Sequence, residues 1–308
     1  MMLKRIWLFL LANIAILLIL TISITILTSV FGIDVWGYFS WETSELMPLL
    51  IFAAIIGFAW AFFSLATSRI FAKWIYKPTL INKENLYNLS SKEKNVYDVV
   101  EKISEREHIK IPEVWIYNSK DPNAFATGPT KNRALVCVSS WLLDIMDKDE
   151  IEWVVAHEMA HVINWDMVTM TLLQWIINTF VIFISRIAAY AFEKFILKSN
   201  ESNPIVYYSV SFVFQIILSI LASIIVAWFS RYREYRADEW SSMYVWKQKM
   251  IASLKKLREY QWKILSDDRD NLATAKISTK KSSWFLKLFA SHPDLELRIK
   301  NLEEKNIA

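Results

Sequence analysis

Glycine, cysteine and charged residues are all scarce in this chain of 308 residues. Its single cysteine, Cys137, excludes an internal disulfide framework and a cysteine-rich metal module, so any metal site must be built from histidines and carboxylates. Charged residues make up 21% of the chain and hydrophobic residues 54%, which excludes a disordered protein and is unusual for a soluble one. The net charge of +4 is too small to indicate a nucleic-acid partner.

Four long stretches of the chain contain no charged residue, and they cover residues 6–31, 47–68, 167–185 and 206–230. A helix needs roughly 20 apolar residues to cross a bilayer. Buried helices of soluble proteins average only about 11 to 12 residues, and a cleaved signal peptide would have a shorter apolar run and a small-residue cleavage site. The sequence therefore predicts four transmembrane helices in two hairpins.

The positions of Lys and Arg indicate how these hairpins are oriented. Lys4 and Arg5 precede the first span and Arg69 follows the second, whereas residues 32–46 contain neither Lys nor Arg. Because Lys and Arg gather on the cytoplasmic side, the long polar blocks are predicted to face the cytoplasm. No charged residue lies in the middle of a span, which disfavours a transporter.

The polar blocks combine helical and strand patterns. Residues 91–109 have the apolar spacing of an amphipathic helix, whereas 113–118 and 134–139 are short, rich in Val and Ile and bounded by turn residues, as strands are. A third, edge strand is expected within 121–128. We therefore predict an α+β fold in four parts, namely a first hairpin at 1–70, a polar part at 71–166, a second hairpin at 167–230 and a second polar part at 231–308.

The motif H-E-M-A-H at residues 157–161 is the sharpest chemical signal. Asp147 and Glu150 form a capping box that begins a helix. On this helix His157 and His161 share one side and can hold one Zn²⁺, while Glu158 can act as a general base. The alternative, two surface histidines at helical spacing, is opposed by the apolar residues around the motif, which would bury it.

A catalytic zinc site with an open position needs a third protein ligand. His292 is the only histidine after His161, so we expect a carboxylate. Glu234 follows the last predicted span, and a hairpin returns the chain to the side where the zinc helix lies. Asp238, four residues later, could accept the free N–H of a zinc histidine. Taken alone, the segment R-E-Y-R-A-D would be read as an exposed salt-bridge cluster.

The chain resembles the HtpX family of integral-membrane zinc metallopeptidases, relatives of the membrane CAAX prenyl proteases. The resemblance covers essentially the whole chain and includes the first hairpin, N-A-F-A-T-G at 123–128, H-E-M-A-H, Asn164, Asp166, 167–171, 229–231, 234–238, S-H-P at 291–293, Arg298 and Ile299. It implies a gluzincin-type metalloprotease domain formed by 71–166 and 231–308, on the cytoplasmic side of a bacterial inner membrane.

The resemblance also implies a metal site. One Zn²⁺ per chain would be bound by His157, His161 and Glu234, and Glu158 would be the general base. Asp238 would not bind the metal itself but would contact one of the histidine ligands.

The resemblance assigns four further residues, one of them, His292, to catalysis and three, Asn123, Ala124 and Arg298, to substrate binding. Asn123 and Ala124 would lie on an edge strand that pairs with substrate backbone, a mode that suits many sequences. His292 and Arg298 would lie near the scissile carbonyl, where a donor stabilises the oxyanion. The alternatives are that His292 caps a helix and that Arg298 forms a surface ion pair.

The function implied is a zinc-dependent endopeptidase acting on protein or peptide substrates, among them misfolded membrane proteins, in quality control under stress. A catalytically inactive, zinc-binding membrane scaffold is the alternative. The sequence leaves the oligomeric state open.

Tryptophan stands where the family pattern has glycine at six positions: Trp60, Trp141, Trp165, Trp175, Trp240 and Trp246. The chain has 4 glycines and 15 tryptophans, whereas a share of about 7% would give roughly twenty glycines. Trp165 follows the zinc helix, at a position that favours the left-handed conformation. Our hypothesis is that the source organism reads UGA codons as glycine, and that these codons are translated as tryptophan in this sequence. The alternative is that the protein is rich in genuine tryptophans. The intact mass of the natively expressed protein distinguishes the two.

Overall fold

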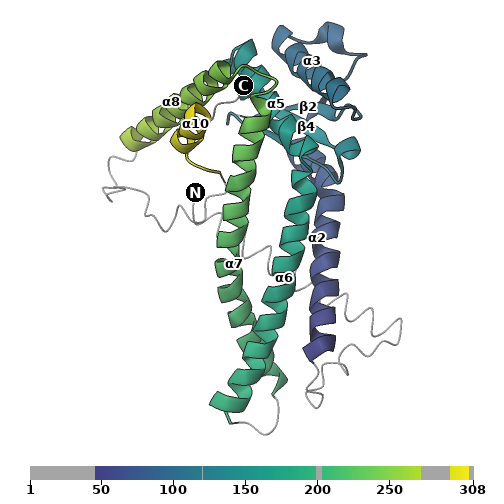
Figure 1. Cartoon of the computed structure of the whole chain (residues 1–308), viewed down its shortest axis with the longest axis vertical. Helices are drawn as coiled ribbons and strands as arrows, with labels where there is room; N and C mark the ends of the chain where they lie inside the picture. The colour runs from purple at the N-terminus through teal and green to yellow at the C-terminus, as the bar shows by residue number, and fades with distance from the viewer. Residues whose placement is uncertain (1–45, 120, 199–202, 272–291, 305–308) are drawn as a thin grey trace. The chain divides into compact units, whose positions relative to one another are not determined.

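The computed structural model describes residues 46–119, 121–198, 203–271 and 292–304 (Figure 1). The helices are α2 Leu46–Tyr76, α3 Ser91–Arg106, α4 Ser140–Ile145, α5 Lys148–Ile163, α6 Asp166–Ala191, α7 Pro204–Ser241, α8 Lys247–Asn271 and α10 Leu295–Glu304, with short helical turns η2 Leu86–Asn88, η3 Lys131–Arg133 and η4 Phe192–Ile196. The strands are β1 Thr79–Ile81, β2 Glu113–Tyr117, β3 Ala124–Thr127 and β4 Leu135–Ser139. The described residues fall into two compact units: those up to Phe63 together with those between Leu172 and Ala222 form one, and those between Ser64 and Thr171 together with those from Ser223 onward form the other.

Three helical segments in the described part of the chain are long and apolar enough to cross a membrane: Leu49–Tyr76, Asp166–Ile196 and Pro204–Ser241. They overlap three of the four predicted spans, and the span at 6–31 lies outside the described residues. Helix α7 has 38 residues and continues without a break through Glu234 and Asp238. The third predicted metal ligand therefore lies on the same helix as the last span.

The first unit is held together by close helix contacts. A Cβ added to Gly57 of α2 would lie 2.8 Å from Oγ1 of Thr179 on α6, so only glycine permits this approach. Trp175 of α6 donates its indole N–H to the Ala54 carbonyl at 2.9 Å. Trp60 lines a cavity of about 40 Å³ together with residues of α6 and α7. Two of the six unusual tryptophans therefore lie at helix contacts.

The second unit is α+β and contains a four-stranded sheet in the order β1-β2-β4-β3. Strands β2 and β4 are parallel, while β1 and β3 pair antiparallel with them at the two edges. Strand β4 is buried along its whole length, as expected of a central strand. The predicted edge strand is confirmed as β3, whereas β1 and α4 were not predicted.

Helix α5 lies at the centre of this unit and packs against α3, β3 and α8. It begins with the predicted capping box: the Asp147 carboxylate accepts from the Glu150 N–H at 2.9 Å, and the Glu150 carboxylate accepts from the Asp147 N–H at 2.8 Å. Eleven of its 16 residues are buried, among them Ile151, Val155 and Met159. The helix that carries H-E-M-A-H is thus fixed by the core.

Candidate metal centre

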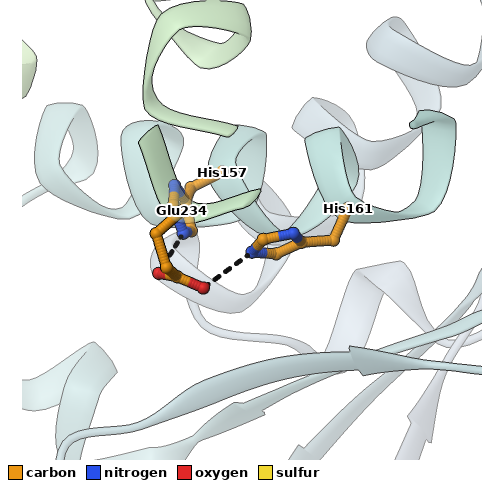
Figure 2. Close-up of side chains that lie close together, drawn as sticks. All are labelled: His157, His161 and Glu234. Carbon is orange, nitrogen blue, oxygen red and sulfur yellow. Dashed lines mark ion pairs between the residues drawn. The ribbon is translucent and has the colours of Figure 1, made fainter. Parts of the chain in front are cut away.

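Two histidines of α5 and one glutamate of α7 converge in the second unit (Figure 2). His157, His161 and Glu234 offer ligand atoms that all lie within 4.8 Å of one another. Nε2 of His157 is 3.4 Å from one Glu234 oxygen, and Nε2 of His161 is 3.5 Å from the other. The predicted ligands therefore meet, although Glu234 lies 73 positions after His161 in the sequence.

The arrangement suits a divalent cation. Glu234 is only 2% exposed, and a buried carboxylate is costly unless it is paired or coordinates a metal. Two imidazole nitrogens and one carboxylate are ligands of the kind that bind transition-metal ions with a further position left open. These three residues could hold one metal ion.

Each histidine contacts an aspartate through its other nitrogen. Nδ1 of His157 is 2.9 Å from Asp238, and Nδ1 of His161 is 2.6 Å from Asp166. The contact of Asp166 was not predicted. The available signal was an aspartate five residues after the second histidine, at the start of the next helix.

These contacts set the charge of the imidazoles. Burial lowers the pKa of His161, but the carboxylates of Asp166 and Glu234 more than offset this and raise it to about 10. Burial likewise opposes protonation of His157, and Asp238 and Glu234 outweigh it, so that its pKa is also raised. The surroundings of both histidines therefore favour a positive charge at this place, and a bound cation would supply that charge in place of the protons.

Arg298 of α10 lies behind this centre. Its Nε and Nη2 donate to the two oxygens of Asp238 at 2.8 and 2.5 Å, and its Nη1 is 3.8 Å from Glu234. The side chain is buried, so the alternative of a surface ion pair is wrong. The geometry favours a role in holding Asp238 over contact with a substrate.

Glu158 points toward the edge of the sheet. It is half-buried, and its carboxylate lies close enough to the main chain of Ala126 on β3 for that N–H to favour the ionised form and lower the pKa. Burial raises the pKa of Glu158, against the opposing effect of the two histidines and of this N–H. Glu158 therefore lies between the predicted metal ligands and the predicted substrate-binding strand.

Asn123 and Ala124 differ in their main-chain contacts. The Asn123 carbonyl accepts from the Ser139 N–H at 2.9 Å, and the Asn123 N–H donates to Ser139 Oγ at 3.0 Å. Because alternate residues of an antiparallel pair face the neighbouring strand, Ala124 and Ala126 present their main-chain groups to the open edge. Of the two predicted residues, Ala124 is the one whose backbone faces outward.

His292 lies beside the third ligand. Its Nδ1 is 3.0 Å from Glu234 Oε2, while its side chain is 70% exposed. At the start of α10 it is Asp294 that accepts from the Glu296 N–H, at 3.2 Å, so the alternative that His292 caps this helix is not supported. The structure therefore places His292 next to Glu234, and its role toward a substrate stays a prediction.

Trp165 lies in the turn between α5 and α6. Its φ is +59°, and its N–H donates to the Val162 carbonyl at 3.3 Å after α5 ends. The expectation that this position is left-handed is confirmed. Its ring is 44% exposed and lies 5.4 Å from the Lys131 ammonium group. A tryptophan here carries backbone strain that glycine would not.

Residues 90–306 match the model of peptidase family M48. The chain belongs to peptidase family M48. The protease HtpX homolog of Bacillus subtilis (strain 168) is 45% identical over 306 residues, which are 99% of this chain and 100% of that protein. The protease HtpX of Alkalilimnicola ehrlichii is 41% identical over 305 residues, 98% of each chain.

The fold of this M48 peptidase also has a solved relative. The crystal structure of S. mikatae Ste24p superposes with a TM-score of 0.60 at 16% identity, covering 94% of this chain and 67% of that one. The resemblance to the HtpX family is therefore confirmed. With its apolar helices, this M48 peptidase is a multi-pass, membrane-embedded metalloprotease that acts on peptides or proteins, and the inactive scaffold is not favoured.

Proposed function

We propose that this peptidase is a zinc-dependent endopeptidase of the bacterial inner membrane that cleaves misfolded membrane proteins as part of quality control. It crosses the membrane four times, and its active site faces the cytoplasm. The convergence of His157, His161 and Glu234 within 4.8 Å carries the proposal. The positive charges that flank the first hairpin support the orientation.

The side chains around the ligands suggest how a peptide bond is cleaved. When bound, zinc would act as a Lewis acid that polarises the scissile carbonyl and lowers the pKa of water at the site. Glu158 takes a proton from the attacking water and delivers it to the leaving amine nitrogen. His292, exposed beside Glu234, donates a hydrogen bond to the oxyanion that forms.

Strand β3 would hold the substrate. A peptide that pairs with the outward-facing backbone of Ala124 extends the sheet by one strand and lies next to Glu158, which contacts Ala126. Pairing through the main chain reads little of the sequence and therefore suits a broad set of unfolded substrates. Access to unfolded segments would then select substrates more than side-chain recognition does.

Cleavage of casein by the detergent-solubilised protein tests the proposal. We expect internal cuts that a zinc chelator abolishes, and a loss of about 10² to 10⁴-fold in rate for Glu158→Gln, because general-base catalysis contributes about that much. Glu152→Gln, a change to another glutamate of α5, is the matched control and should keep the activity. Zinc-loaded wild-type protein that cuts nothing would restore the scaffold alternative.

A further inference from the structure

The carboxylate of Asp166 is placed where it can control His161. Its Oδ2 is 2.6 Å from His161 Nδ1, and the residue is only 2% exposed. The Nε2 atom of the same ring faces Glu234. If Nδ1 carries the ring proton and donates a hydrogen bond to Asp166, Nε2 is unprotonated and its lone pair can bind a metal ion.

The main chain of Asp166 is anchored from two directions. Its carbonyl accepts from Thr169 Oγ1 at 3.1 Å and from Nη1 of Arg233 at 3.3 Å. Arg233 directly precedes the third ligand on α7, so the segment that supplies Glu234 also fixes Asp166. Trp165 adopts a left-handed conformation in the turn between α5 and α6, and the side chains of His161 and Asp166 meet across this turn.

The two histidines are therefore held in the same manner by aspartates from different helices. Asp238 on α7 contacts Nδ1 of His157. The guanidinium group of Arg298 donates hydrogen bonds to both oxygens of the Asp238 carboxylate. Asp166 at the start of α6 contacts Nδ1 of His161, and the contact of Arg233 goes to its main-chain oxygen. Neither Asp166 nor Arg298 needs to touch a metal or a substrate to matter in this arrangement.

We propose that Asp166 is a positioning residue for His161: it fixes the ring and its tautomer so that Nε2 faces the metal ion. The inference rests on the proposed metal site and adds to it a determinant of metal affinity. Loss of such a partner typically weakens metal binding about 10 to 100-fold.

Zinc binding to the full-length, detergent-solubilised chain tests this role. The dissociation constant would be measured by competition with a chromogenic chelator for wild type, Asp166→Asn, Asp166→Ser and Asp166→Ala. Serine and alanine cannot reach Nδ1, so we expect about 10 to 100-fold weaker binding. Asparagine keeps an acceptor oxygen without the charge and should fall between these variants and wild type.

A matched variant separates this role from a structural one. Asp149 is an acidic residue in the first turn of α5 and pairs with Lys249 at 2.7 Å. If Asp166 only favoured the start of its helix through its charge, Asp149→Ser and Asp166→Ser would both leave the zinc dissociation constant unchanged. We expect only Asp166→Ser to weaken binding and to shift the visible absorption bands of the Co²⁺-loaded protein, because only His161 is reoriented.

The outcomes also separate this inference from the proposed metal site. Wild-type protein that binds no zinc would overturn both. Tight binding by wild type and an equal dissociation constant for folded Asp166→Ser would overturn only the role of Asp166. If Asp166→Ser and Asp166→Ala fail to fold, Asp166→Asn decides: weaker binding supports the role, and unchanged binding refutes it.

Discussion

At the scale of single residues, protons and the metal ion compete for the same nitrogen atoms. The pKa of His161 is raised to about 10, so its ring carries an extra proton at neutral pH until a cation displaces it, and the pKa of His157 is raised as well, so this ring takes up a proton more readily than a free imidazole. Lowering the pH therefore favours the protonated, metal-free form.

We expect zinc affinity to fall as the pH is lowered from 8 to 6. Each displaced proton changes the dissociation constant by up to about tenfold per pH unit, and the two histidines allow one to two protons. Because the raised pKa of His161 lies above this range, the slope should persist across it. Chelator competition at pH 6, 7 and 8 measures the effect, and a constant affinity would show that the imidazoles are neutral before binding.

The same residues show how far sequence reasoning reaches into the site. His157, His161, Glu234 and Asp238 are predictable because helical spacing and the return of a membrane hairpin fix their relative positions. The contact of Asp166 depends on one left-handed turn, and that of Arg298 on how α10 packs. Spacing along the chain places Asp166 five residues after His161, but it does not by itself determine either of these contacts.

At the scale of elements, the turn between α5 and α6 combines a functional position with strain. Trp165 adopts a φ of +59°, which costs a residue with a Cβ roughly 1 to 2 kcal/mol and costs glycine nothing comparable. The ring offsets part of this through its contact with Lys131. The strain lies four residues after a metal ligand and one residue before Asp166.

We expect Trp165→Gly to be more stable than Trp165→Ala by about 1 kcal/mol, since both variants lose the ring and only glycine relieves the backbone. Chemical denaturation of the detergent-solubilised, metal-free protein measures the difference. The same pair of changes at Trp141, inside α4, is the control, and there alanine should be the more stable by about 0.5 to 1 kcal/mol. Equal stability of the two Trp165 variants would contradict the strain argument.

Elements with a strong local signal were predicted, whereas two short elements, β1 and α4, were not. A few neighbouring residues are enough to predict four of the elements. These are α5 from its capping box, α3 from its apolar spacing, and β2 and β4 from their Val and Ile content. Strand β1 has three residues and α4 has six, so neither contains a full pattern. The continuation of α7 through Glu234 was missed because charged residues there resemble the end of a span.

At the scale of the whole molecule, the orientation in the membrane decides which proteins the site can reach. We expect Lys83→Cys to react with a membrane-impermeant maleimide only in inverted vesicles, and Lys198→Cys only in spheroplasts. Both positions are exposed. Burial raises the pKa of the native Cys137 thiol to about 12, so it should give little background labelling. The reverse pattern would place the active site outside.

Binding of one metal ion by three side chains, from two helices that are far apart in the sequence, is the central requirement of the proposed function. Metal content of the purified, dialysed protein tests it most directly. We expect one zinc per wild-type chain, a loss of most of it in Glu234→Ala, and wild-type content in Glu239→Ala, which changes another glutamate of α7. Full zinc occupancy in Glu234→Ala would contradict the account.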